Sequence, residues 1–152
     1  MDQTYLDFLD YLEELGGILE KLTFTAKEKT MAARVGDLVK VDACMKQEQI
    51  YSLSLRGMDK KREKMLEEMG LQGVTLSQMK DHYPPELRDR AAKTVEKTQA
   101  SYEVYLSASN AAKTTMEMAL RDIDRMFPEG LRPAPGVPQD SPPPKMKTDF
   151  RA

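Results

Sequence analysis

The longest stretch without glycine or proline, residues 86–127, constrains the fold of this chain most strongly. Within it an apolar or small residue recurs alternately three and four positions apart, which predicts one helix of about 60 Å with a narrow seam for partner helices. Pro85 suits the first turn of such a helix and Pro128 ends it. A helix this long cannot bury its seam against itself, so the rest of the chain must pack against it. The seam comprises Ala91, Val95, Thr98, Tyr102, Tyr105, Ser109, Ala112, Met116, Ala119, Ile123 and Met126.

A second seam with the same spacing predicts a helix at the start of the chain. Gly16 and Gly17 interrupt it, and each glycine costs a helix interior about 1 kcal/mol relative to alanine. Because the seam keeps its phase through the pair, we expect one helix with a soft point, where a neighbouring backbone comes close or the helix kinks. This seam comprises Tyr5, Phe8, Leu12, Leu15, Leu19, Leu22 and Ala26.

The phase changes at Gly36 and Asp37. Glycine can adopt the left-handed conformation that ends a helix, and aspartate can cap the next one. A tight antiparallel reversal is therefore the preferred interpretation, and a stutter within one longer helix is the alternative. Polar residues occupy the middle of the next seam, so that part of the second helix is expected to be shallowly buried or turned; they are Glu48, Ser52, Asp59 and Arg62. Gly70 and Gly73 mark its end.

Thr75 and Gln78 have the spacing of a capping box and predict a short helix that ends near His82. From Pro128 onward lie seven of the 9 prolines, so residues 128–152 are expected to be a disordered, proline-rich tail. The sequence thus predicts an all-α fold: an antiparallel, coiled-coil-like bundle of three long helices plus one short helix over residues 1–127.

The composition excludes several classes of protein. The net charge of -2 provides no basic field for nucleic acid, and the basic run from Lys60 to Lys64 is neutralised by acidic neighbours. No stretch is long and apolar enough to span a membrane, and the acidic N-terminus lacks the pattern of a secretory signal. Cys44 is the single cysteine, so no internal disulfide forms. We therefore expect a cytoplasmic protein.

No catalytic or cofactor-binding constellation is predicted. His82 is the single histidine and lies beside a turn, and Cys44 is best explained as a small core residue of an amphipathic helix. The carboxylates alternate with lysines and arginines as on solvated helix faces, and no glycine spacing matches a phosphate-binding loop. We expect no metal and no cofactor, and a binding protein in place of an enzyme.

Methionines concentrate near the end of the long helix. Met116, Met118 and Met126 lie beside Leu120, Ile123 and Phe127 and occupy more than one face of the helix. Flexible thioethers adapt to varied apolar partners, which favours a binding surface here; ordinary core packing is the alternative.

The chain resembles the FlgN family of bacterial flagellar export chaperones. The resemblance covers residues 1 to about 127 and rests on three patterns: LEELGGILEKLTFTAKEKTMAA in the first helix, KQEQ followed by DKKREKMLEEMG in the second, and YEVYLSASNAAKTTMEMALRDID in the last. The family often has two asparagines three residues apart in the last helix. Asn110 matches the second of them, and Ser107 replaces the first.

The resemblance implies a cytoplasmic chaperone that keeps hook-associated proteins of the hook–filament junction unpolymerised and delivers them to the type III export gate. It assigns client binding to Asn110, Met116, Leu120, Ile123 and Phe127, with Leu131 as a contact in the tail. An aromatic residue near the tail, Phe127 or Phe150, is the expected contact with the export gate. The alternative function is a structural scaffold, in which the seams close by homo-oligomerisation, for example as a homodimer.

Overall fold

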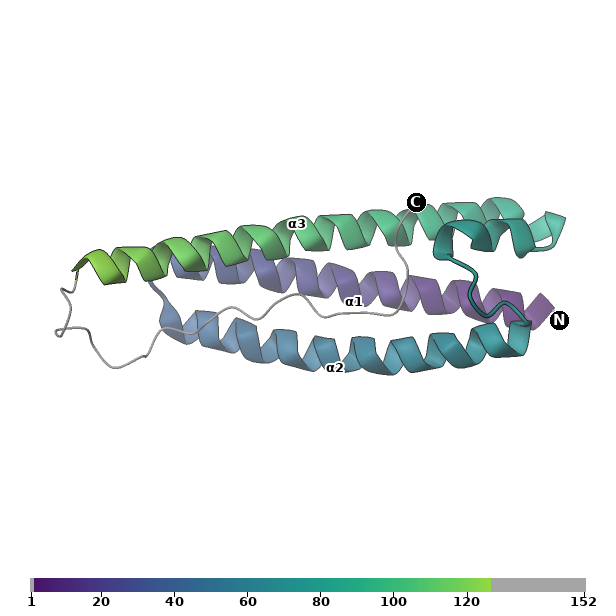
Figure 1. Ribbon diagram of the computed structural model, residues 1–152, viewed down its shortest axis with the longest axis horizontal. Coiled ribbons are helices and arrows are strands. Elements are labelled where there is room, and N and C mark those ends of the chain that lie inside the picture. Colours follow the sequence, from purple (N-terminus) through teal and green to yellow (C-terminus); the bar gives the residue numbers. More distant parts are fainter. Residues whose placement is uncertain (1, 127–152) are drawn as a thin grey trace.

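The computed structural model describes residues 2–126, and all of its elements are helices (Figure 1). There are three long helices, α1 (Asp2–Val35), α2 (Leu38–Met69) and α3 (Arg88–Met126). Two short 3-10 helices, η1 (Leu76–His82) and η2 (Pro85–Leu87), lie between α2 and α3. The prediction of an all-α bundle with three long helices and a short one is confirmed. The predicted tail, residues 128–152, lies outside the described residues.

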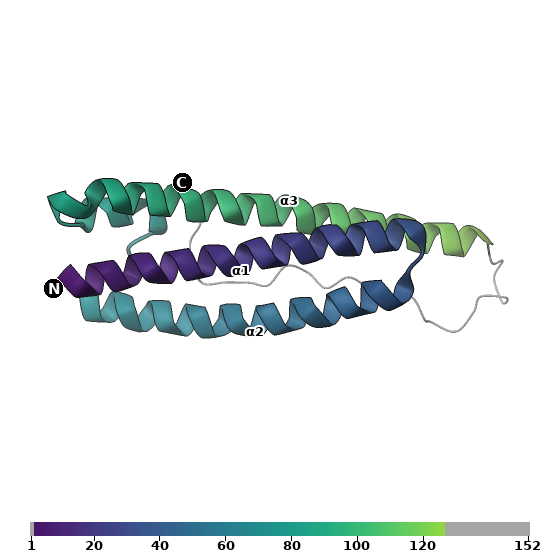
Figure 2. The same ribbon diagram turned by 180° about the vertical axis from the view of Figure 1, so that it is seen from behind.

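Helix α1 lies between the other two long helices (Figures 1 and 2). Consecutive long helices run antiparallel, so α3 returns to the direction of α1. Both α2 and α3 pack along α1, whereas within residues 2–126 no Cα atom of α2 comes within 8 Å of one of α3. Helix α1 therefore buries side chains on two sides, and α2 and α3 each keep wide exposed faces.

The reversal between α1 and α2 takes the two residues predicted for it. Gly36 has a φ of 75°, in the left-handed region. The backbone N–H of Asp37 donates to the carbonyl of Ala32 at 2.9 Å, which closes the end of α1. The Asp37 carboxylate accepts from the backbone N–H of Lys40 at 3.1 Å, which caps the start of α2. The stutter alternative is excluded, since the two helices are separate elements.

Helix α1 passes through Gly16 and Gly17 without interruption. The expected close approach of a neighbouring backbone is wrong, because no other atom lies within 4 Å of where a side-chain Cβ would sit at either glycine. The prediction of one continuous helix through the glycine pair is confirmed. The pair thus leaves space unfilled on the surface of α1.

The seams form one large apolar cluster at the end of the bundle where α1 begins. Helix α1 supplies its centre, and its seam residues there are essentially inaccessible to solvent. The cluster comprises Phe8, Leu9, Tyr11, Leu12, Leu15, Leu19, Leu22, Leu55, Met58, Met65, Leu66, Leu76, Met79, Tyr83, Ala91, Val95 and Tyr105. Burial of this apolar surface is the main stabilising contribution to the bundle.

Helix α2 is continuous through its polar middle, so the expectation that this part turns is wrong. Leu55, Met58 and Asp59 are buried there, and the Asp59 carboxylate lies 3.8 Å from the guanidinium of Arg62. The other expectation, shallow burial, is confirmed for Glu48, Ser52 and Arg62, which are half-buried. Asp59 is buried more deeply, next to the charge of Arg62. The helix ends at Gly70 in the left-handed conformation, as predicted.

Tyr83 ties the connection before α3 to the start of α1. Its hydroxyl donates to the backbone carbonyl of Tyr5 at 2.9 Å, and the two rings meet edge to face at 4.8 Å between centroids. Burial raises the pKa of Tyr83 well above its usual range, so the hydroxyl remains a donor. This contact places the first turn of α3 beside the first turn of α1.

The short elements differ in type from the prediction. The backbone N–H of Thr75 donates to the Gln78 side chain at 3.2 Å, as in the predicted capping box, but the helix that follows is a 3-10 helix. Similarly, Pro85 begins a 3-10 turn, and the long helix itself begins at Arg88. Its regular part is therefore two residues shorter at the start than residues 86–127 suggested.

Candidate functional site

The end of α3 extends beyond the turn that joins α1 to α2 (Figures 1 and 2). Two contacts define the relative position of the helices: the Thr98 hydroxyl donates to the carbonyl of Leu12 at 3.4 Å, and Met116 packs in a cluster with Ala32. The last turns of α3 therefore have no counterpart in α1, which ends at Val35 (Figure 1).

The inward seam of α3 continues into this extension. Ser109, Ala112 and Met116 are buried. The next seam residues, Ala119 and Ile123, are half-buried, and so is Leu120 beside them. An apolar helical face thus passes the point where the other long helices end. The last seam residue, Met126, is 71% exposed, and Met118, 57% exposed, adds apolar surface on another side of the helix.

The sequence-predicted client residues occupy different environments. Asn110 is exposed on α3, Ile123 lies on the extended seam, and Leu120 lies beside that seam. Met116 is only 2% exposed and packs against Ala32 of α1 and Val41 of α2. Phe127, Leu131 and Phe150 lie outside the described residues.

The burial of Met116 changes the role that can be proposed for it. Its side chain is already enclosed by α1 and α2, so a partner would have to displace one of these helices to reach it. The structure therefore separates Met116, which packs within the bundle, from Leu120 and Ile123, which lie at its open end. Helical spacing alone places Met116 and Ile123 on one seam with Leu120 beside it, and does not distinguish the three.

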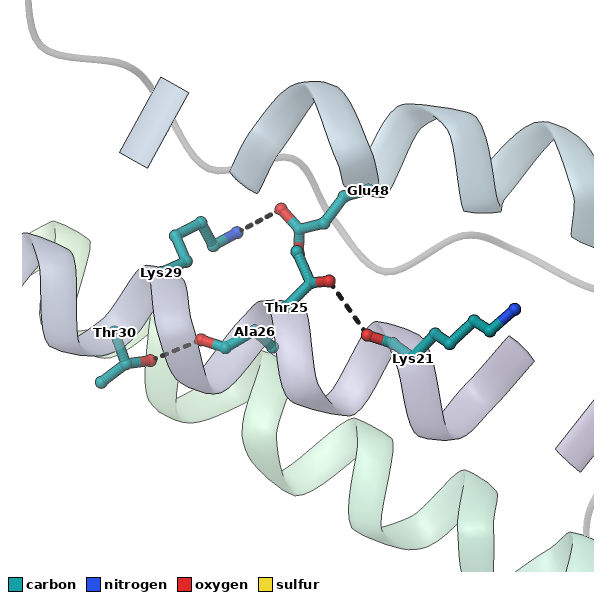
Figure 3. Close-up of polar contacts among 6 residues, drawn as sticks. All are labelled: Lys21, Thr25, Ala26, Lys29, Thr30 and Glu48. Carbon is teal, nitrogen blue, oxygen red and sulfur yellow. Dashed lines mark hydrogen bonds and ion pairs between the residues drawn. The ribbon is translucent and has the colours of Figure 1, made fainter. Parts of the chain in front are cut away.

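A buried ion pair replaces apolar packing between α1 and α2 at this end of the bundle (Figure 3). The Lys29 ammonium lies 2.8 Å from the Glu48 carboxylate, and the side chains are 2% and 19% exposed. The apolar cluster nearby is small, with Ala32, Val41 and Met116 as its buried members. This end of the bundle consequently buries less apolar surface than the other.

Hydroxyl groups on α1 accompany the pair. Thr25 donates to the carbonyl of Lys21 at 2.9 Å, and Thr30 donates to that of Ala26 at 3.0 Å, so both buried hydroxyls are satisfied within their own helix (Figure 3). They add polar groups to a region that a tight core would fill with apolar side chains.

Sequence reasoning missed the ion pair, although a signal for it existed. Lys29 follows Ala26 by three residues and so continues the seam of α1, and Glu48 occupies the seam of α2. Opposite charges at seam positions of two antiparallel neighbours indicate an interhelical pair.

Few of the described side chains are placed to act in catalysis or metal binding. Within residues 2–126 no group of three or more histidine, cysteine, aspartate or glutamate side chains is placed to hold a metal ion. His82 is exposed, and burial raises the pKa of the Cys44 thiol, which opposes formation of a reactive thiolate. No helix of the described part is long and apolar enough to cross a membrane.

Comparison with known proteins identifies one related family. A family model described as FlgN protein matches residues 1–120. Neither the search of curated proteins nor the search of solved structures gave a match. The matched range includes α1, α2, both short helices and α3 as far as Leu120.

Proposed function

The chain belongs to the FlgN family, and on this premise we propose that it is a cytoplasmic flagellar export chaperone. It binds hook-associated proteins of the hook–filament junction, prevents their premature polymerisation and delivers them to the type III export gate. The family match over most of the chain is the observation that carries this proposal.

The extended seam of α3 supports a place for the client. Leu120 and Ile123 continue an apolar helical face beyond the end of α1, where a helix of another protein can pack against it. Such packing covers apolar segments through which client molecules would otherwise associate with each other. Asn110, Phe127 and Leu131 remain part of the proposed client surface, and Phe127 or Phe150 the proposed contact with the export gate.

In this proposal Met116 does not contact the client directly. Its buried side chain holds α3 against α1 and α2, just before the seam becomes accessible. We assign it the role of positioning the end of α3, and the direct contacts to Leu120 and Ile123.

The test is to mix the full chain with the C-terminal helical segment of a hook-associated protein and measure the molar mass by size-exclusion chromatography with light scattering. We expect a monomer that forms a one-to-one complex. The double variant Leu120→Asp, Ile123→Asp should lose the complex and retain its helical circular dichroism. The matched control Leu53→Asp, at an exposed position of α2, should bind normally.

Two results would count against the proposal. If the native chain ignores the segment and forms a stable homodimer that the double variant disrupts, the protein is a structural scaffold whose seams close between copies. If the double variant loses its helical signal, Leu120 and Ile123 belong to the core and the client contact lies elsewhere.

A further inference from the structure

A groove follows the junction of α1 and α3, on the face of α1 that points away from α2. Its volume is about 510 Å³, and its walls come from both helices. Lys27 of α1 lines it, whereas Lys29, two residues later and therefore about 200° around the helix, faces α2. The lining residues are Lys27, Thr30, Met31, Arg34, Val104, Ser107, Ala108 and Ala111.

The groove has bulky, exposed apolar walls and a floor of small residues. Met31 and Val104 are 63% and 51% exposed, although both are large apolar side chains. Ser107, Ala108 and Ala111 of α3 leave room beside them for the side chains of another element. Grouped exposed apolar residues mark interaction sites more often than scattered ones do.

The apolar stripe continues at both ends of the groove. Phe24, 66% exposed, lies seven residues before Met31 on α1. Met118, 57% exposed, lies seven residues after Ala111 on α3. Seven residues are two helical turns, so these side chains share the stripe of the groove. From Val104 to Met118 the stripe extends about 21 Å, which is about the length of a helix of four turns.

The charged side chains that line the groove are basic. Among residues 2–126, its lining contains the basic side chains Lys27 and Arg34 and no acidic one. Glu28, the acidic residue between them in the sequence, is held by Lys40 of α2 at 2.7 Å. Lys27 and Arg34 lie seven residues apart on the same stripe of α1. The groove therefore complements acidic groups at the same separation.

From this combination we propose that the groove binds an amphipathic helix of a partner protein. The partner's bulky apolar side chains, one or two per turn, lie over the small residues of α3 between Met31 and Val104. Two acidic side chains at the edge of its apolar face, seven residues apart, pair with Lys27 and Arg34. The site goes beyond the chaperone function proposed above, because it is separate from the end of α3.

The test uses two fluorescent synthetic helical peptides of about four to five turns. Both have a leucine stripe; one has glutamate at two flanking positions seven residues apart, and the other has lysine there. Binding to the full chain is measured by anisotropy. We expect the glutamate peptide to bind about tenfold more tightly than the lysine peptide, with a difference that shrinks in high salt.

Three variants locate the binding. Met31→Glu, or Val104→Glu on the other wall, should lower the affinity for the glutamate peptide at least about tenfold, since a charge then replaces exposed apolar surface. The matched control Val39→Glu, on α2 and 83% exposed, should leave binding unchanged. The charge reversal Lys27→Glu, Arg34→Glu should make the lysine peptide the tighter ligand.

Other outcomes overturn the proposal. Equal binding of both peptides, or equal losses in Met31→Glu and Val39→Glu, would mean that the groove does not select an acidic helix. A dimer of the native chain that Met31→Glu dissociates would assign the groove to a second copy. Binding that appears only after removal of residues 127–152 would assign it to the chain's own C-terminal segment.

Discussion

Replacing Gly16 and Gly17 with alanine should stabilise the protein. Both glycines lie inside α1, and neither has another atom within 4 Å of the position that a new Cβ would take. Alanine therefore enters without a clash, and the folded state needs no adjustment. What changes is the conformational entropy that the chain loses when these two residues become helical.

The expected magnitude follows from helix propensity. Glycine is less favourable than alanine by about 0.8–1.0 kcal/mol in a helix interior, so the double variant gains about 2 kcal/mol in the free energy of unfolding. For a chain of this size, 1 kcal/mol corresponds to about 2–4 °C in melting temperature, which gives a rise of about 6 °C. Gly36→Ala provides the matched control, because its φ of 75° is strained for any residue with a Cβ. The Gly36→Ala variant should lose about 1 kcal/mol in the free energy of unfolding.

Thermal and urea unfolding followed by circular dichroism measure both effects. The reasoning requires opposite signs for the same substitution at two sites of one protein. A double variant that is destabilised would show that the space beside Gly16 and Gly17 is occupied, or that α1 bends there. A neutral Gly36→Ala would show that the turn does not depend on the left-handed conformation.

Two further predictions concern polar contacts. Glu48→Gln should destabilise the protein by about 2–3 kcal/mol, somewhat less than for a fully enclosed pair, since it removes the negative charge that lies 2.8 Å from the buried Lys29 ammonium. The double variant Lys29→Met, Glu48→Leu should recover most of this loss in urea unfolding, and additive losses would mean that the two charges do not act as a pair. Tyr83→Phe should cost about 1 kcal/mol, because it removes the hydrogen bond to the Tyr5 carbonyl. Tyr51→Phe is its control, and equal losses in both would indicate that the cost comes from ring packing.

Much of the fold was predictable because its signals are local. The three-and-four spacing located each long helix, and the pair Gly36 and Asp37 located the reversal, since helix caps depend on residues within one turn. The errors also have local explanations. Asp59 in the middle of α2 looked too polar to be buried, because its interaction with Arg62 depends on helical geometry and burial together.

The candidate site was harder to predict from spacing. Met116 and Ile123 share one seam and Leu120 lies beside it, so periodicity treats them alike. Met116 has Ala32 and Val41 as neighbours, whereas Leu120 and Ile123 lie further along α3 and are half-buried. Which seam residues are enclosed depends on how far each helix extends along its neighbours, and spacing within one helix contains no such information.

The sequence by itself determined the helices, their order and their buried faces, because backbone hydrogen bonding and hydrophobic periodicity act over a few residues. Only the tertiary structure decided the offset of α3 along α1, where the contact between Tyr83 and Tyr5 aligns their first turns. That offset leaves the end of α3 beyond the bundle and forms the groove between Met31 and Val104. Both binding surfaces proposed for this protein result from the relative position of two helices whose contacting residues lie about eighty positions apart in the chain.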